Sequence, residues 1–211
     1  RRARLVVNLG GISNVTYVPK GGHLSGVLAF DTGPANMVLD GLMARVTDGR
    51  LSMDRDGKLA MKGQVDSRLL GKLLAHPFLS KRPPKSTGRE DFGPALVEEL
   101  IAIHQQRSLS IEDLLATCSM WTAKAVGTSR RWISGEIDEV VVGGGGQREH
   151  PSDPAEAPMA GFSQSADGLY PAERLLDTLA QALAGRIAGM PGRAAVDRRA
   201  PVGGVLRDVR R

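Results

Sequence analysis

The residues that could do chemistry in this chain begin with a glycine pair close to the amino terminus. Gly10 and Gly11 separate two β-rich runs, and the hydrogen-bonding side chains of Asn8, Ser13 and Asn14 stand beside them. This pattern is typical of a hairpin with a tight turn, where glycines can adopt positive φ. A turn of bare N–H groups with small polar neighbours suits a phosphate group. The alternative is an ordinary antiparallel hairpin, because a glycine-rich turn alone is weak evidence.

A second glycine stretch follows a run of apolar residues near the middle of the chain. Residues 139–142 predict a buried strand, which leads directly into four glycines, Gly143 to Gly146. Glycines at the carboxyl end of a strand let a flat or charged ligand lie against the backbone, at the edge where α/β folds bind nucleotides. The alternative is a plain flexible loop.

Two further stretches carry polar groups that could bind a ligand. Asp31 and Thr32 lie where a strand predicted over 24–30 ends and an amphipathic helix over 34–46 begins. A helix start attracts anions, and a carboxylate there can hold a metal ion or a hydroxyl group; alternatively, Asp31 or Thr32 simply caps the helix. The loop 81–90 carries four cations and two hydroxyl groups, which could contact phosphate or sugar oxygens or could be solvated.

Other reactive side chains show no functional spacing. The four histidines have no metal-ligand spacing with one another or with Cys118, and the turn 54–57 begins like a calcium loop whose later ligands are missing. Cys118 lies on an apolar helical stripe, which predicts a core residue rather than a nucleophile. A single cysteine also excludes an internal disulfide and suits a reducing compartment. We therefore predict no metal site.

The elements that must position these residues alternate between strands and helices. The hairpin and the third strand form a β-meander. After the helix over 34–46, the apolar periodicity places three further helices over 65–75, 94–104 and 111 to about 132, and the predicted strand over 139–142 follows them. A last helix is predicted over 172–188. This order predicts an α/β fold with a mixed sheet, a β-meander at its start and flanking helices.

Composition and charge restrict the class of protein further. The 211 residues are 41% hydrophobic and 24% charged, which is ordinary for a globular chain. Residues 186–211 contain seven arginines and two aspartates, and so account for the whole net charge of +5. The basic character therefore predicts a solvated, partly disordered end rather than a nucleic-acid surface. We predict a domain over 1–191, with an irregular insertion-like segment at 147–168, and an Arg-rich tail at 192–211.

The chain shows neither a signal peptide nor an apolar run of the roughly 20 residues that a membrane span needs. We therefore expect a cytoplasmic protein without nucleic-acid or membrane partners. The chain opens at Arg1 only a few residues before a strand. That start is typical of a piece of something longer.

The order of the motifs is more specific than any one of them. The chain contains, in sequence, NLGGISNVTYV, FDTGPANMVLD, DRDGKLAMKG, PKSTGREDF and EVVVGGGG. Over about residues 4 to 148 this series resembles the carboxyl-terminal half of the anhydro-N-acetylmuramic acid kinase family. The resemblance implies the second lobe of an actin-like ATPase or sugar kinase fold, in which two related α/β lobes close over ATP.

The resemblance also implies roles for residues of this chain. Cofactor binding is implied for residues that face the phosphates or lie near the adenosine: Asn8, Gly10, Gly11, Ser13, Asn14, Gly143, Gly144 and Gly145. The cleft between the lobes, as part of the substrate site, is implied to be lined by Asp31, Thr32, Gly33 and Asn36, with contacts to the sugar or to the nucleotide. The expected cofactors are ATP and Mg²⁺, the expected small-molecule partner is an amino sugar, and the resemblance also allows a homodimer.

The function implied by the resemblance is a sugar kinase reaction of cell-wall recycling. ATP phosphorylates 1,6-anhydro-N-acetylmuramic acid while water opens the anhydro ring, which gives N-acetylmuramic acid 6-phosphate. The family carries its catalytic base and another phosphate loop in the first lobe, and neither is in this sequence. We therefore expect no catalytic residue here and an inactive fragment. The alternative is a degenerate, non-catalytic lobe that binds nucleotide or dimerises.

Overall fold

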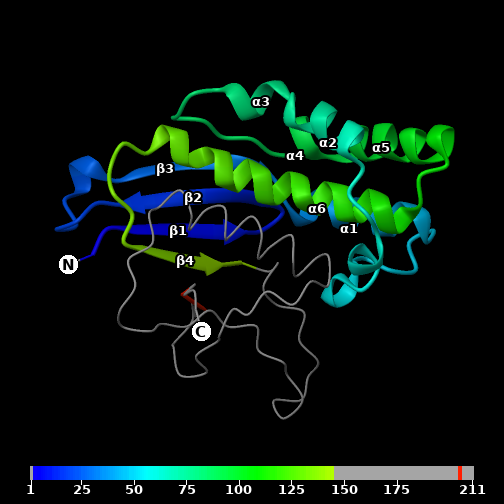
Figure 1. Cartoon of the computed structure of the whole chain (residues 1–211), viewed down its shortest axis with the longest axis horizontal. Helices are drawn as coiled ribbons and strands as arrows, with labels where there is room; N and C mark the ends of the chain where they lie inside the picture. Colours follow the sequence, from blue (N-terminus) through cyan, green and yellow to red (C-terminus); the bar gives the residue numbers. More distant parts are fainter. Residues whose placement is uncertain (1, 145–203, 206–211) are drawn as a thin grey trace, which may run out of the picture.

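The computed structural model describes residues 2–144 and 204–205, and Figure 1 draws the other residues as a thin grey trace. Part of the sequence analysis therefore lies outside the described residues. This part comprises Gly145 and Gly146, the segment 147–168, the helix predicted over 172–188 and almost all of the tail 192–211. The domain boundary at residue 191 stays a prediction.

The centre of the described chain is a mixed sheet that begins with a β-meander (Figure 1). The strands β1 (Arg4–Leu9), β2 (Ile12–Val18) and β3 (Leu28–Pro34) are antiparallel neighbours, whereas β4 (Glu139–Gly143) pairs with β1 in parallel. A short strand β5 (Gly204–Val205) follows, so that the order is β3-β2-β1-β4-β5. The predicted α/β class with a mixed sheet and flanking helices is confirmed.

The alternation of side chains along β1 determines which face of the sheet the helices cover. Leu5, Val7 and Leu9 are buried, whereas Arg4 is exposed and Val6 keeps 36% of its surface accessible. Successive side chains of a strand point to opposite faces. The apolar members of β1 therefore face the helices, and Arg4 and Val6 face the open side of the sheet.

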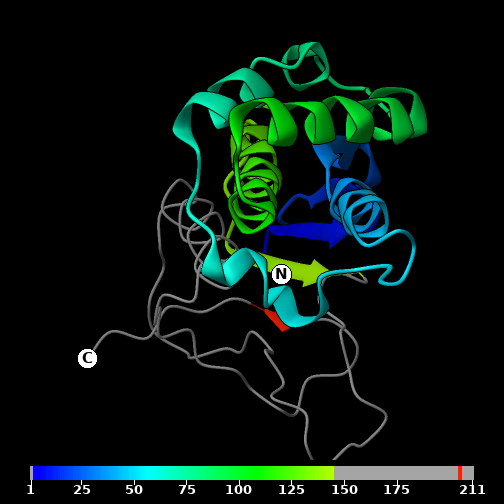
Figure 2. The same cartoon turned by 90° about the vertical axis from the view of Figure 1, so that its right-hand side faces the viewer.

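The α-helices of the described residues lie on that apolar side (Figure 2). They are α1 (Asn36–Val46), α2 (Ser67–Leu74), α3 (Pro77–Ser80), α4 (Arg89–Phe92), α5 (Pro94–Arg107) and α6 (Ile111–Thr128). Figure 2 shows α1 and α6 side by side above the sheet, with α5 crossing them on the side away from the sheet. Among the described helices, none combines the length and apolar character that a bilayer crossing requires.

Helix α6 is the main support of the sheet, and its sequence explains its bounds. The Ser110 hydroxyl caps its start by accepting a hydrogen bond of 3.0 Å from the Asp113 amide. A 3₁₀ turn (Ser129–Trp132) continues the helix, which explains why the apolar periodicity reaches residue 132. Cys118 is buried on this helix, and burial raises the pKa of its thiol to about 12. The prediction of a core residue at Cys118 is confirmed.

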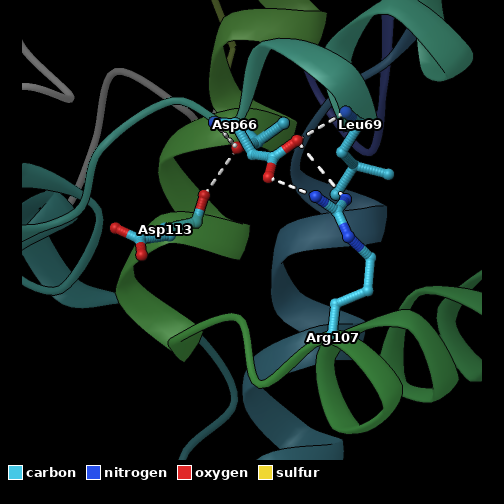
Figure 3. Close-up of polar contacts among 5 residues, drawn as sticks. Asp66, Leu69, Arg107 and Asp113 are labelled. Atoms are coloured by element: carbon cyan, nitrogen blue, oxygen red, sulfur yellow. Dashed lines mark hydrogen bonds and ion pairs between the residues drawn. The ribbon is translucent and has the colours of Figure 1, made fainter.

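A polar cluster fastens α2 to α5 and α6 (Figure 3). The Asp66 carboxylate caps α2 by accepting the Leu69 amide at 2.6 Å, and Arg107 donates to the same carboxylate at 2.7 Å. The Asp66 amide donates to the Thr117 hydroxyl at 2.9 Å, and that hydroxyl donates to the Asp113 carbonyl. The Leu69 amide and then Arg107 hold the pKa of Asp66 below its usual value.

The third strand and the first helix begin later than the sequence predicts. Residues Leu24–Gly26 form a 3₁₀ turn after Gly21 and Gly22, which both adopt positive φ, and β3 starts only at Leu28. The strand continues through Pro34, which an edge strand tolerates because its outer amides need no ladder partner. Pro34, which the sequence predicts near the first turn of the helix, lies two residues before the start of α1, at the end of β3.

Candidate functional site

The two glycine stretches meet at one edge of the sheet. Because β1 and β4 are parallel, their carboxyl ends lie at the same edge, where Asn8 is paired with Gly143. Gly144 adopts φ +102° and passes so close to β1 that a Cβ there would come within 2.5 Å of Asn8 Oδ1 and 2.6 Å of the Leu9 carbonyl. We call Gly10, Gly11, Gly143 and Gly144 the glycine edge.

The hairpin turn at the glycine edge is tied to the start of α1. The Gly10 carbonyl accepts the Asn36 amide at 3.0 Å, and the Gly11 carbonyl accepts the amides of Ala35 at 3.2 Å and Met37 at 3.0 Å. Neither glycine has the positive φ that the sequence suggested. The first amides of α1 are therefore bonded within the chain, and this helix start does not offer them to an anion.

At two positions of the glycine edge, no contact with the described residues requires glycine. A Cβ on Gly143 would meet nothing within 4 Å, and one on Gly10 would make only ordinary contacts, at 3.5 Å or more, among the described residues. Gly144, in contrast, is required by its φ and by its packing against Asn8. The outer side of the edge is thus open and lined by backbone.

A row of polar side chains crosses the open face of the sheet next to the glycine edge. The register pairs Asn8 with Asn14 and Asn14 with Asp31, so that these three half-buried side chains lie on neighbouring strands, with Gly143 at the end of the row. Directly paired residues present their side chains on the same face. Gly143, which is far from the other three in the sequence, is therefore the neighbour of Asn8 in this row.

Ser13 and Thr32 lie on the other face, inside the protein. Their hydroxyl oxygens are 2.7 Å apart, both residues are at most 1% exposed, and Ser13 also donates toward the carbonyls of Gly33 and Pro34. A Cβ on Gly33 would come within 2.9 Å of Leu79. These predicted site residues join β2 to β3 and do not reach the open face in this structure.

Asp31 does not cap α1 but fastens the loop 81–88 to the edge strand β3. Its carboxylate oxygen Oδ2 accepts the Ser86 hydroxyl and the Thr87 amide, each at 2.9 Å, and its own amide donates to the Lys85 carbonyl at 3.1 Å. The start of α1 is instead at Ala35, without a side-chain cap. A hollow of about 270 Å³ lies here, lined by residues that include Asn14, Asp31, Lys85 and Ser86.

Asn36 reaches the glycine edge, and a carboxylate that the sequence analysis did not single out lies nearby on the same helix. The Asn36 side chain donates to the Leu9 carbonyl at 3.4 Å. Asp40 follows four residues later on α1, which places it on the same side of the helix. It is half-buried, and burial raises its pKa. Its only sequence signal was its place at the end of the run FDTGPANMVLD.

Metal ligands are not gathered anywhere in residues 2–144. No group of three or more histidine, cysteine, aspartate or glutamate side chains is close enough there to hold an ion. The turn 54–57 uses Asp54 structurally, because its carboxylate accepts the amides of Leu59 and Ala60, each at 2.9 Å.

The fold and this edge define the class of protein as an α/β lobe whose central parallel strands end in glycines. Comparison with known proteins then gives the family. The family model for anhydro-N-acetylmuramic acid kinase matches residues 1–151, and this chain belongs to that family.

Individual relatives agree with the family assignment. The chain is 47% identical over 147 residues to the anhydro-N-acetylmuramic acid kinase of Salinibacter ruber, with 68% of this chain and 36% of the relative covered. The enzyme of the same name from Caldanaerobacter subterraneus subsp. tengcongensis is 44% identical over 142 residues, with 66% and 36% covered. The chain thus spans little more than a third of the length of these relatives.

A solved structure also matches part of the chain. It is the activator of the 2-hydroxyisocaproyl-CoA dehydratase from Clostridium difficile with bound ADPNP, at a TM-score of 0.40 and 20% identity, with 67% of this chain and 45% of that chain covered. A structural similarity at this TM-score does not indicate a shared function.

Proposed function

We propose that this chain is the nucleotide-side lobe of a sugar kinase that uses ATP to phosphorylate 1,6-anhydro-N-acetylmuramic acid, with hydrolytic opening of the anhydro ring. One observation carries the proposal beyond the family assignment. Two glycine stretches that are far apart in the sequence come together at the carboxyl ends of adjacent parallel strands, because Asn8 pairs with Gly143. Ligands of open α/β sheets bind at such strand ends.

The glycine edge supplies the backbone surface that the proposed nucleotide needs. Gly10 and Gly143 have room for a further atom on their outer side, because a Cβ on either would make no close contact. We assign the hairpin glycines, with Asn8 and Asn14, to the phosphates, and Gly143 to Gly145 to the adenosine. Since this edge carries few charges, it would hold phosphates by close approach to amide groups rather than by ion pairs.

The remaining predicted residues have positioning roles in this proposal. The hydroxyl pair of Ser13 and Thr32 keeps β2 and β3 in register behind the polar row. Asp31 and Asn36 line the side of the site that would face the sugar. Positioning and electrostatic stabilisation supply most of the rate in phosphoryl transfer. These residues therefore matter for geometry rather than for bond making.

Magnesium fits the proposal only as an ion that the nucleotide carries. Such an ion typically has one or two carboxylate ligands and takes its other ligands from phosphates and water. The described residues contain no three-ligand cluster, and Asp31 already accepts two hydrogen bonds. When bound, the ion would offset the negative charge of the phosphates. We assign the base that takes the proton of the attacking water to the part of the relatives that this chain does not match.

Two measurements on the 211-residue chain test the proposal. Calorimetric titration with a non-hydrolysable ATP analogue is expected to show binding, and a Gly10→Val and Gly11→Val double substitution is expected to abolish it. An assay with ATP and the anhydro sugar is expected to show no turnover, because the chain covers about a third of its relatives. Robust turnover would refute the assignment of the base, and absence of nucleotide binding would leave only a degenerate lobe.

A further inference from the structure

A cluster of cations surrounds two aromatic rings on the side of the molecule that carries the edge strand β3. The Lys81 and Lys85 ammonium groups lie 5.4 Å and 4.4 Å from the centre of the Phe78 ring. The Arg82 and Arg131 guanidinium groups lie 5.9 Å and 4.7 Å from the Trp132 ring. We call Lys81, Arg82, Lys85 and Arg131 the basic cluster.

The cluster is built from segments far apart in the sequence and is fixed by backbone contacts. Lys85 donates to the Phe78 carbonyl at 3.1 Å, and Arg131 donates to the Leu79 carbonyl. These bonds hold one cation from the loop 81–88 and one from the 3₁₀ turn after α6 against the same short helix, α3. The positions of the two charges are therefore set by the fold rather than by flexible side chains alone.

The charge of the cluster is not neutralised by ion pairs within the described chain. None of the ion pairs among residues 2–144 involves any of its four members. Burial, together with the charges of Arg131 and Lys81, lowers the pKa of Lys85 to about 8, and Asp31 is the acid that opposes this shift. Lys81 and Arg131 are thus close enough to repel the charge of Lys85, and the opposing carboxylate of Asp31 already accepts two hydrogen bonds from Ser86 and Thr87.

We infer that the basic cluster, together with the hollow beside it, binds the phosphate monoester group of a small molecule. The hollow of about 270 Å³ is lined by residues that include Asn14, Asp31, Lys85 and Ser86, and Lys85 belongs both to the hollow and to the basic cluster. Arginine and lysine side chains bind phosphate through charge-assisted hydrogen bonds. A dianionic phosphate at the cluster would balance charges that otherwise repel one another.

The hollow shares Asn14 and Asp31 with the site proposed above, whereas Lys81, Arg82 and Arg131 have no part in that site, so the inference does not rest on the proposed kinase function. Strand β3, which carries the hollow, and strand β4, which carries Gly143, are separated by two strands. Three strand spacings put about 14 Å between them. A small size for the ligand follows from the hollow, since a nucleic acid or protein partner would need a broad surface rather than a pocket of this volume.

Trp132 offers a local signal for the test, because two cluster arginines stack on it and the other tryptophan of the chain, Trp121, is fully buried. Inorganic phosphate is titrated into the full chain at constant ionic strength while tryptophan emission is recorded. We expect a saturable change that Trp132→Phe removes. Lys85→Met should weaken the dissociation constant by about tenfold, whereas Lys85→Arg, which keeps the charge, should weaken it much less.

Controls decide whether the effect belongs to this site. Lys72→Met removes an exposed lysine on α2 and should leave the titration unchanged. Arg131→Gln provides a second cluster variant in case Lys85→Met unfolds, which thermal unfolding would reveal. The inference is overturned by the absence of a saturable response, by an equal loss in Lys72→Met, or by tighter binding of malonate than of phosphate. Tighter, strongly salt-dependent binding of duplex DNA would likewise overturn it, in favour of a nucleic-acid surface.

Discussion

The glycine edge and the basic cluster are both proposed to bind anions, but by opposite physical means. The glycine edge presents backbone with almost no side chains, and its geometry follows from the pairing of Asn8 with Gly143. The basic cluster presents four charges held against the Phe78 and Trp132 rings. A ligand at the first region should therefore be lost when a methyl group is added, and a ligand at the second when a charge is removed.

The largest expected effect comes from a methyl group within the glycine edge itself. Gly144→Ala places a Cβ against Asn8 Oδ1 and the Leu9 carbonyl at a residue with φ +102°, so we expect a loss of about 2–4 kcal/mol in the free energy of unfolding. Gly143→Ala is the matched control, because its Cβ meets nothing within 4 Å, and it should change stability by less than about 0.5 kcal/mol. Urea denaturation of both variants measures the difference, and equal stability would contradict the packing at Gly144.

A smaller effect is expected from a change that touches neither region. Asp66→Ala removes the cap of α2 and the ion pair with Arg107, which should cost about 1–2 kcal/mol. Since the folded state lowers the pKa of Asp66, its contribution is present above the ordinary pKa near 4 and is lost as the pH falls below that value.

Thermal unfolding at pH 7 and pH 3 tests this expectation. The difference in stability between the wild-type protein and Asp66→Ala should be smaller at pH 3 than at pH 7. The wild-type protein and Asp66→Ala should bind the nucleotide and phosphate equally well at pH 7. An advantage that is the same at the two pH values would show that the carboxylate charge contributes nothing.

The smallest expected effect separates the two regions by pH. Lys85 has a pKa of about 8, so it is charged below that value and becomes neutral as the pH rises through it. Phosphate binding at the basic cluster should therefore weaken severalfold between pH 7 and pH 9, whereas nucleotide binding at the glycine edge should not follow this profile. Phosphate binding by the Lys85→Arg variant should not weaken over the same pH range. A decline of equal size in both titrations would mean that one site binds both ligands.

The sequence predicts much of the fold, because local patterns determine most of its elements. Helix α6 follows from its apolar period and from Ser110, and β4 follows from a run of valines that ends in glycines. The sequence predicted that the third strand begins at Leu24, but Leu24 is exposed on a 3₁₀ turn. Its apolar character alone does not show whether such a residue lies in a buried strand or in an exposed turn.

The sequence proposed candidate site residues one by one, and these stay predictions, but it did not reveal which of them are neighbours. The hydroxyls of Ser13 and Thr32 were expected at the site, yet the alternation along β2 and β3 places them inside. The bond from Ser86 to Asp31 joins positions 55 residues apart, and no local pattern reports it. The basic cluster was hidden for the same reason, since Arg131 reaches it from another element.

The central claim is that the two glycine stretches form one nucleotide-binding edge. The most direct test is calorimetric titration of a non-hydrolysable ATP analogue into the wild-type chain and into Gly143→Val, with Gly71→Val on the exposed side of α2 as the matched control. Neither new side chain meets a described neighbour at its Cβ, so the two variants differ in place rather than in packing. The account predicts that Gly143→Val weakens binding by at least about tenfold and Gly71→Val leaves it unchanged. Unaltered binding in Gly143→Val would contradict it.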